Sequence, residues 1–443
     1  MNALERLLTK HIFKRITGRD DLHLIFANIG WQSFDQLFRM GVGLLVGFRV
    51  TKYLGPEQNG IFYLVITLSM LIAPIANAGI DAILSRDLAN KNENKGKLLG
   101  TALIMKMLYS IASYTALSIY AYFSYGNTPL IFTAILIVSL NLFSNNIILI
   151  FDQYFQSIIK SKYTVYAKTT VFAIFVILKL YFVFIQAPLL WFVSLFVLES
   201  VASAIGVGVL YLFQTNRTSH WSFDIEVFKS YFTNGYLLIF QGLLLGIQSY
   251  IDQVMLAEFI NFKELGWYSV AYRFVTVFSF LSISICGSLT TTLAQAKINS
   301  TELFHKKMQN LYRTMFLLFA FIFILITASN GIIIDMFLGE KFEPCKHLIL
   351  LMAGRLFFTH FGLARSQYIT NTNQFSFLMI TTLTGTISSI ALNYALIPIL
   401  GVNGAIVSFY VSYFISTFAI DIFHPTMRTN LQLMVNGCMF WKK

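Results

Sequence analysis

The sequence predicts an all-α polytopic membrane protein, on three grounds: its composition, the length of its apolar segments and the charges between them. Of its 443 residues, 56% are hydrophobic and 12% are charged, and the mean hydropathy is +0.68. So little polar surface cannot cover a water-soluble body of this size. About a dozen apolar stretches follow one another, each near the ~20 residues that a helix needs to cross a bilayer.

Twelve transmembrane helices in two groups of six account for nearly the whole length. We expect the first six at about 24–50, 59–80, 98–123, 129–151, 164–185 and 188–213. We expect the second six at about 229–256, 266–290, 311–333, 345–365, 375–398 and 402–422. The resulting units are an interfacial helix over 1–22, an N-lobe over 23–215, a cytoplasmic linker over 216–228, a C-lobe over 229–423 and a cytoplasmic tail over 424–443.

The charges between these spans alternate as a membrane topology requires. Lys and Arg gather in every second loop, with a bias of roughly five to one, which places both termini in the cytoplasm under the positive-inside rule. An even number of spans follows. The net charge of +12 therefore reports topology, and we expect no nucleic-acid partner.

The two halves of the chain are candidates for an internal repeat. A shift of 206 residues without a gap lays Gly60 on Gly266, so that the first two helices align with the seventh and eighth. An alternative alignment of the similar segments at Gly43 and Gly242 uses a different shift and stays open. Two parallel copies of six helices would be related by an axis along the membrane normal, with a central cavity between the lobes.

Basic residues at membrane depth indicate what such a cavity binds. Seven lie within the predicted spans: Arg39, Arg49, Lys106, Lys168, Lys179, Arg273 and Arg355. A cation facing lipid at the bilayer centre costs ~3 kcal/mol on insertion scales, so the deep ones must face protein or water. Acids at this depth are fewer, which predicts a cationic cavity that attracts an anion. The candidate ligands are Arg39, Lys106, Lys179, Arg273 and Arg355; Arg49 can instead snorkel to the interface.

Polar residues at helical spacing mark the same lumen. Two such stripes are Asn28, Gln32, Asp35 and Arg39 in the first helix, and Asn234, Gln241, Gln248 and Asp252 in the seventh. The candidates for ion coupling or for polar cavity lining are Asp35, Glu199, Asp252, Gln241 and Gln248. Two other interpretations stay open: the stripes can join helices by hydrogen bonds, and Asp35 can neutralise Arg39 one turn away.

Signals for an enzyme are missing from the sequence. The predicted outer loops are too short to hold a sugar chain, and no Gly-rich loop with Lys and Ser or Thr is present to bind ATP. The seven His and the three Cys show no metal-ligand spacing. We therefore expect neither catalysis, nor a metal, nor a cofactor.

Four segments in register carry a resemblance to a known family. They are LGPEQNGIFYLVITL (54–68), GIDAILSRDLAN (79–90), IDQVMLAEF (251–259) and LNYALIPILGVNGAI (392–406). The chain thereby resembles the polysaccharide flippases of the multidrug/oligosaccharidyl-lipid/polysaccharide superfamily, and in particular the Wzx-type O-antigen flippases. The similarity runs through nearly the whole chain.

The resemblance implies a MATE-like fold, with two six-helix bundles around a cationic cavity. It implies a multi-pass protein of the bacterial cytoplasmic membrane that flips an oligosaccharide repeat unit on undecaprenyl pyrophosphate, with the polymerase and chain-length regulator of the pathway as partners. Asp35, Arg39 and Arg273 carry over as cavity residues. Coupling to protons or sodium stays open. The alternatives are a membrane polymerase of the same pathway and an exporter of small molecules.

Overall fold

The computed structural model describes residues 20–90, 94–214 and 221–439, with backbone only for 20–29 and 32–34, and all regular elements in this part of the chain are helices. In the first half they are α2 (Asp20–Ala76), α3 (Asp81–Ala89), α4 (Lys95–Tyr125), α5 (Pro129–Ser139), α6 (Asn141–Ser157), α7 (Lys162–Phe184) and α8 (Leu189–Gln214). In the second half they are α9 (Ile225–Phe259), α10 (Phe262–Thr276), α11 (Ser279–Asn299), α12 (Thr301–Ile333), η2 (Ile334–Leu338), η3 (Glu340–Phe342), α13 (Pro344–Ala353), α14 (Arg355–Asn371), α15 (Phe375–Leu400), α16 (Val402–Phe414), η4 (Ile415–Ala419), η5 (Ile420–Phe423) and α17 (Pro425–Cys438). The predicted interfacial helix over 1–22 lies almost entirely outside the described residues.

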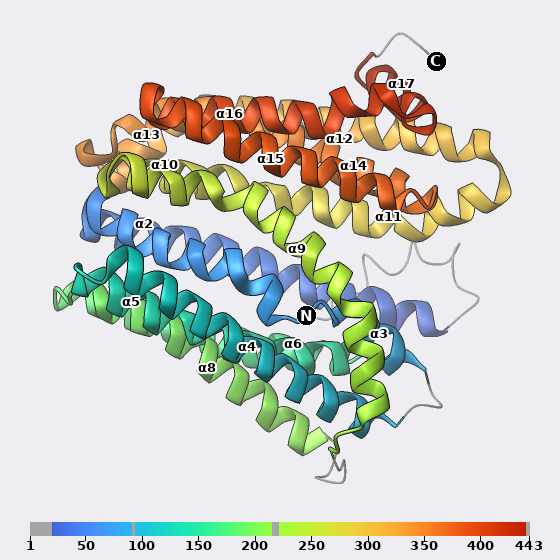
Figure 1. Cartoon of the computed structure of the whole chain (residues 1–443), viewed down its shortest axis with the longest axis horizontal. Coiled ribbons are helices and arrows are strands. Elements are labelled where there is room, and N and C mark those ends of the chain that lie inside the picture. Colours follow the sequence, from blue (N-terminus) through green and yellow to red (C-terminus); the bar gives the residue numbers. More distant parts are fainter. Residues whose placement is uncertain (1–19, 91–93, 215–220, 440–443) are drawn as a thin grey trace, which may run out of the picture.

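Eleven helical segments of the described chain are long and apolar enough to cross a membrane. The first runs from Asp35 to Ala76 and covers most of the first two predicted spans, 24–50 and 59–80. A straight helix of that length would extend over ~60 Å at 1.5 Å per residue. It is broken at Gly55, whose φ of 72° and ψ of 173° are not helical, and Figure 1 shows α2 doubling back there. The eleven segments thus accommodate the twelve predicted spans.

Three predicted spans are each broken into two helices. The break in the fourth falls at Leu140, between α5 and α6, and the break in the eighth at Val277 and Phe278, between α10 and α11. The tenth breaks at Gly354, where a Cβ would lie 2.4 Å from the Tyr410 hydroxyl. Period and hydropathy continue across all three positions, so the sequence pattern did not locate these breaks.

The apolar core shows how the two halves of the chain meet. The largest cluster joins Leu64 and Val193 to Leu265 and Ile349, and it includes Leu54 beside the Gly55 break. Two further clusters are separate from it. One is made of buried apolar residues between positions 78 and 231, and the other of buried apolar residues between positions 286 and 434. The halves therefore share one core at the end of the bundle where α2 turns, and each has its own core toward the opposite end, where α2 begins and α17 lies (the terminus end; Figure 1).

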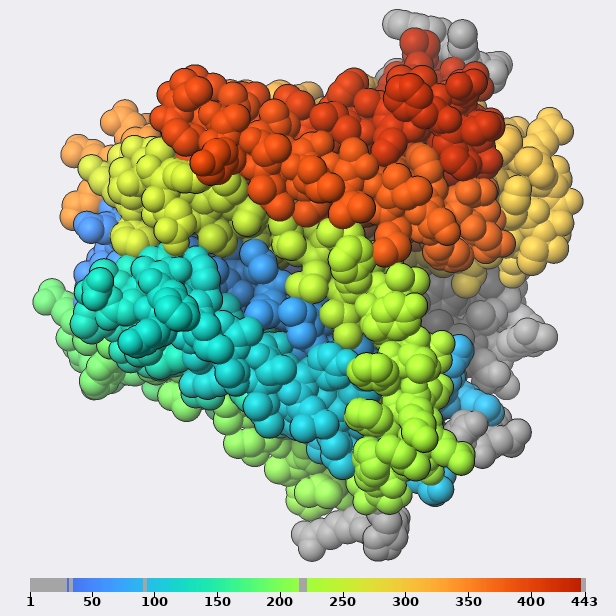
Figure 2. Space-filling model, in the orientation of Figure 1, coloured from blue at the N-terminus to red at the C-terminus, as the bar shows by residue number. Residues whose placement is uncertain are grey.

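Helix α9 connects the two halves and runs obliquely across them (Figure 2). Its first turns pack against the N-terminal half, where a Cβ on Gly235 would lie 2.7 Å from the carbonyl oxygen of Ala78. Its later turns pack against α10 and α15. The start of this helix thus lies against the first half, although the sequence groups residues from 229 onward with the second.

Residues after 424, expected as a tail, contain helix α17 at the terminus end of the bundle. Asn430 accepts a hydrogen bond of 2.7 Å from the Tyr312 hydroxyl, and Met427 and Met434 are buried on the same face. Spacings of three and four residues place these side chains in one stripe. The stripe docks α17 on α12, so this segment is part of the folded body.

Candidate functional site

A cavity of about 1170 Å³ is lined by residues of both halves of the chain. Both arms of α2 line it, together with residues of α6, α7, α8, α9 and α10. Arg39 and Asn77 both line this space although 38 residues separate them, because the chain reverses between them. A second cavity, of about 410 Å³, shares Arg39, Asp152 and Lys168 with the first and extends the space toward the terminus end. Its walls come from the start of α2, from α6 and from α7.

Two arginines line the main cavity without a carboxylate partner among the described residues. Arg39 places its guanidinium carbon 5.2 Å from the ring centroid of Phe172. Arg273 places its own 4.7 Å from the ring centroid of Tyr63, and donates a hydrogen bond of 3.2 Å to the Tyr63 hydroxyl. Aromatic faces orient a guanidinium without neutralising it. Arg39 and Arg273 therefore keep their charge available to a ligand in the cavity.

The two lysines of the lining, in contrast, are paired. Lys179 forms an ion pair of 2.6 Å with Glu199, and Lys168 forms one with Asp152. All four residues line the main cavity. Each pair cancels its own charge, so the net positive charge of the lining comes from Arg39 and Arg273.

Lys106, a predicted ligand, does not line this cavity. Its side chain is fully buried, and its ammonium nitrogen lies 2.5 Å from Asp81 and 2.5 Å from Asn77. Burying a lysine is tolerable only when it is paired and hydrogen bonded. The expectation that Lys106 faces the cavity is thus corrected, because Asp81 from α3 satisfies it within the packed helices.

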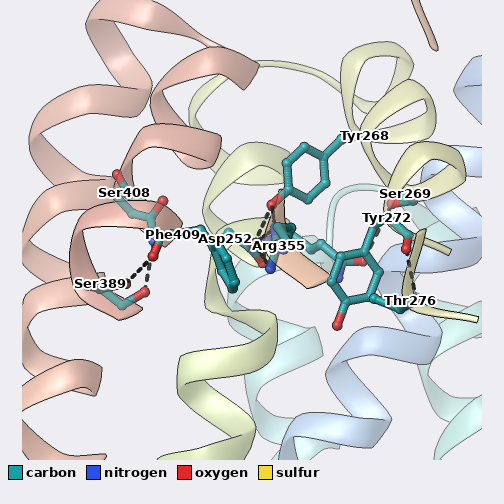
Figure 3. Close-up of polar contacts among 12 residues, drawn as sticks. Asp252, Tyr268, Ser269, Tyr272, Thr276, Arg355, Ser389, Ser408 and Phe409 are labelled. Carbon is teal, nitrogen blue, oxygen red and sulfur yellow. Dashed lines mark hydrogen bonds and ion pairs between the residues drawn. The ribbon is translucent and has the colours of Figure 1, made fainter. Parts of the chain in front are cut away.

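Arg355, the other predicted ligand that lies outside the cavity, is the centre of a buried cluster in the second half (Figure 3). It donates hydrogen bonds of 3.2 Å to Asp252 and 2.7 Å to the Tyr268 hydroxyl. The rings of Phe409 and Tyr272 lie 3.6 and 4.9 Å from its guanidinium carbon. Arg355 and Asp252 are only 3% and 4% exposed, so neither reaches the cavity and both expectations are corrected.

The glutamines predicted in the seventh span lie away from the lining as well. Gln248 is buried and its amide donates to Ser416 at 3.3 Å, close against Gly385. Gln241 is partly buried next to the lining residue Gly242, but does not itself line the cavity. Gln248 and Asp252 of this stripe therefore join helices, which is the alternative that the sequence left open.

Asp35 and Glu199 do lie at the two cavities. Asp35 lines the smaller one and accepts a hydrogen bond of 2.6 Å from Thr169, and it forms no ion pair with Arg39 in the described chain. The side chains of Asn28 and Gln32, on the same predicted stripe, lie outside the described residues.

Sequence reasoning missed several residues of the lining. Asp152 pairs with Lys168, and Tyr63 supports Arg273. A signal for Asp152 was present, because Asn141, Asn145 and Asp152 follow helical spacing and all three line the cavity. Tyr63 carried no comparable signal, since its pairing with Arg273 joins two helices far apart in sequence.

The sequence profile of the family described as polysaccharide biosynthesis protein matches residues 25–297, well over half of the chain. The chain belongs to this family. The match covers both arms of α2, the break at α5 and α6, and helix α10 with Arg273, so it includes all the cavity residues described above. It also agrees with the resemblance drawn from the four sequence segments, which is thereby confirmed.

Solved structures place the fold of this polysaccharide biosynthesis family member. It is similar to the lipid II flippase MurJ in an inward closed conformation, with a TM-score of 0.70 and 13% identity, covering 91% of this chain and 90% of that one. It is similar to an inward-facing multidrug resistance MATE family transporter of the MOP superfamily, with a TM-score of 0.68 and 13% identity over 91% and 96%. It is also similar to a MOP superfamily transporter from Pyrococcus furiosus, with a TM-score of 0.65 and 13% identity, covering 95% of this chain and 99% of that one. The predicted MATE-like membrane fold is confirmed, and no curated protein matches the sequence.

Proposed function

We propose that this protein is a flippase that moves a lipid-linked oligosaccharide across the bacterial cytoplasmic membrane without catalysing a reaction. The substrate we infer is an O-antigen repeat unit on undecaprenyl pyrophosphate. The observation that carries the proposal is the cavity of about 1170 Å³ with two cations, Arg39 and Arg273, that belong to different halves of the chain and have no carboxylate partner among the described residues. Membership of the polysaccharide biosynthesis family supports the class of substrate.

A diphosphate suits this lining because of its charge and its shape. The diphosphate oxygens lose water on entering the cavity, and guanidinium groups replace that water with paired, charge-assisted hydrogen bonds. Arg273 is held against the ring of Tyr63 and Arg39 against the ring of Phe172, so little side-chain freedom is lost on binding. The apolar tail would stay in the bilayer while the head group occupies the cavity.

The position of the shared core supports a mechanism of alternating access. The two halves meet in one apolar core at the end where α2 turns, and the cavities extend toward the terminus end. Under the positive-inside rule the terminus end faces the cytoplasm, so this conformation would load substrate from inside. Rocking of an N-lobe (23–215) against a C-lobe (229–423) would then expose the cavity outside, where the polymerase and chain-length regulator take over.

The test uses a host that makes the repeat unit but lacks this gene. We expect undecaprenyl-linked units to accumulate inside, with no unit on the outer surface. A single unpolymerised unit on the surface would mean that flipping persists and that the chain acts in polymerisation. Unchanged surface polysaccharide would point to the export of small molecules.

Charge-neutralised variants then assign the cavity. Arg39→Gln and Arg273→Gln should each reduce surface polysaccharide at least tenfold, because each removes a charge-assisted contact of ~1.5–3 kcal/mol. Lys160→Gln, an exposed cation outside the cavity, is the matched control and should transport normally. Wild-type transport by both arginine variants, with normal membrane levels, would contradict the cationic-cavity proposal.

A further inference from the structure

The wall of the cavity formed by α6 and α8 differs chemically from the rest of the lining. Its charged residues, Asp152 and Glu199, are neutralised by Lys168 and Lys179 of α7. This side therefore offers hydrogen bonds but no net charge. The net positive charge lies on α2 and α10, where Arg39 and Arg273 have no carboxylate partner within the described part of the chain.

Asn141 supplies an unused hydrogen-bond acceptor to this wall. It stands directly after the break at Leu140, where α5 ends and α6 begins, and it lines the cavity. Its side chain is only 8% exposed, yet its Oδ1 atom accepts no hydrogen bond from the described residues. A buried acceptor without a partner destabilises a protein. The Oδ1 atom is closed off from solvent, so it would gain a partner by a turn of the amide toward a donor in the cavity that Asn141 lines.

Asn145, one turn further along α6, supplies the complementary donors. Ser200 of α8 donates to its Oδ1 atom at 3.4 Å, and Ser144 donates to Ser200 at 2.8 Å. This chain of hydroxyls holds the amide by its oxygen and leaves its N–H groups for the cavity, where Asn145 is exposed. Acceptor and donor thus lie four residues apart on one helical face.

Phe196 completes the wall from α8, one turn before Ser200, and also lines the cavity. A sugar ring carries hydroxyls that both donate and accept, and a face of C–H groups that packs on an aromatic ring. An isoprenoid tail would leave both asparagines unsatisfied, and a diphosphate would find no net positive charge here. Of the three parts of a lipid-linked oligosaccharide, the sugar alone matches this wall.

We propose that Asn141, Asn145, Ser200 and Phe196 form a subsite for an uncharged sugar ring of the transported head group. The inference rests on the proposed function and adds to it a division of the cavity. The diphosphate binds between Arg39 and Arg273, and the saccharide lies against α6 and α8. Substitutions in this subsite should change which repeat unit is accepted, and should leave diphosphate binding unaltered.

The experiment measures binding of two probes to the purified full-length protein in detergent. One probe is the lipid-linked repeat unit extracted from the host that lacks this gene, and the other is bare undecaprenyl pyrophosphate. The variants are Asn145→Ala, at an exposed position where folding is least affected, and the double variant Asn141→Leu/Asn145→Leu. The control is Asn234→Leu, an exposed amide of α9 that does not line the cavity.

We expect the double variant to lose about tenfold in affinity for the repeat-unit probe, as two neutral hydrogen bonds would give, while binding the bare lipid within about twofold of wild type. Asn145→Ala should lose roughly threefold with the same selectivity. Equal losses for both probes, or no loss for either, would overturn the subsite and leave the flippase proposal standing. Failure of the wild-type protein to bind either probe would overturn the flippase proposal and the subsite with it.

Discussion

Gly60 of α2 and Gly266 of α10 pack backbone against backbone at the end of the bundle where α2 turns. A Cβ on Gly60 would lie 1.8 Å from the carbonyl oxygen of Phe262, and a Cβ on Gly266 would lie 1.9 Å from that of Pro56. The contact is reciprocal, and both pairs are related by the shift of 206 residues that aligns the two halves of the sequence. Reciprocal contacts of this kind arise where a two-fold axis passes between equivalent elements.

This crossing should not accept even one methyl group. In Gly60→Ala the helices α2 and α10 must separate. We therefore expect the contact at Gly60 and Gly266, which closes this end of the bundle, to open and transport to fall at least tenfold. A cysteine placed at Val50, which lines the cavity, should then react faster with a membrane-impermeant thiol reagent added outside. Gly287→Ala is the control, because nothing lies within 4 Å of its added Cβ. Normal transport by Gly60→Ala would show that this contact tolerates separation.

Lys179 was predicted to bind substrate, whereas its 2.6 Å contact with Glu199 allows a purely neutralising role. A double-mutant cycle separates the two. Lys179→Met alone should reduce transport because it leaves Glu199 as an uncompensated anion in a cavity for anions. If the lysine only neutralises Glu199, then Lys179→Met/Glu199→Gln should recover most of the activity. A double variant as inactive as the single one would assign Lys179 to the substrate.

Arg355 should matter for stability more than for binding. Its removal in Arg355→Met leaves the Asp252 carboxylate buried without its cation, which typically costs ~3–5 kcal/mol. Thermal unfolding of the detergent-solubilised protein should show a marked loss of stability, and Arg355→Met/Asp252→Asn should recover much of it. Lys306→Met, at an exposed position, is the control. If Arg355→Met unfolded like the control, the cluster in Figure 3 would not be holding α9, α10 and α14 together.

Asp224, in the linker before α9, should make a pH-dependent contribution to the stability of the fold. A hydrogen bond of 3.0 Å from Lys97, followed by those from the backbone N–H groups of Val227 and Glu226, lowers the pKa of its carboxyl group below the usual 3.8. A lowered folded-state pKa stabilises the fold above the unfolded pKa, and that stabilisation is lost as the pH falls through the folded value. Asp224→Asn keeps the helix cap but removes the charge. Its stability deficit should be constant near neutral pH and shrink as the pH falls below the unfolded carboxyl pKa, as measured by unfolding from pH 7 to 3. A deficit that is as large at pH 3 as at pH 7 would contradict the charge assignment.

Part of the site could be predicted from the free-energy cost of placing a charged side chain in lipid. A cation at membrane depth must face protein or water, so the sequence identified Arg39, Lys179 and Arg273 as interior residues. The same rule cannot say whether the interior neighbour is a cavity or a carboxylate. Lys106 illustrates this, because its partner Asp81 lies in α3, which packs against α4 only through the tertiary fold.

By itself the sequence determined that the chain crosses a membrane and where its apolar spans lie, since hydropathy acts locally along the chain. The side that each loop faces stays a prediction from loop charge. It also determined the family, because the resemblance runs through most of the length. Only the tertiary structure decided that Arg39 and Arg273 have no carboxylate partner among the residues it describes, that Arg355 and Lys106 are neutralised, and that Asn141 and Asn145 share a wall with Phe196 and Ser200. The physical reason is that pairing depends on which helix faces meet, and residues of different helices, 25 positions apart for Lys106 and Asp81 and 103 apart for Arg355 and Asp252, determine those faces together.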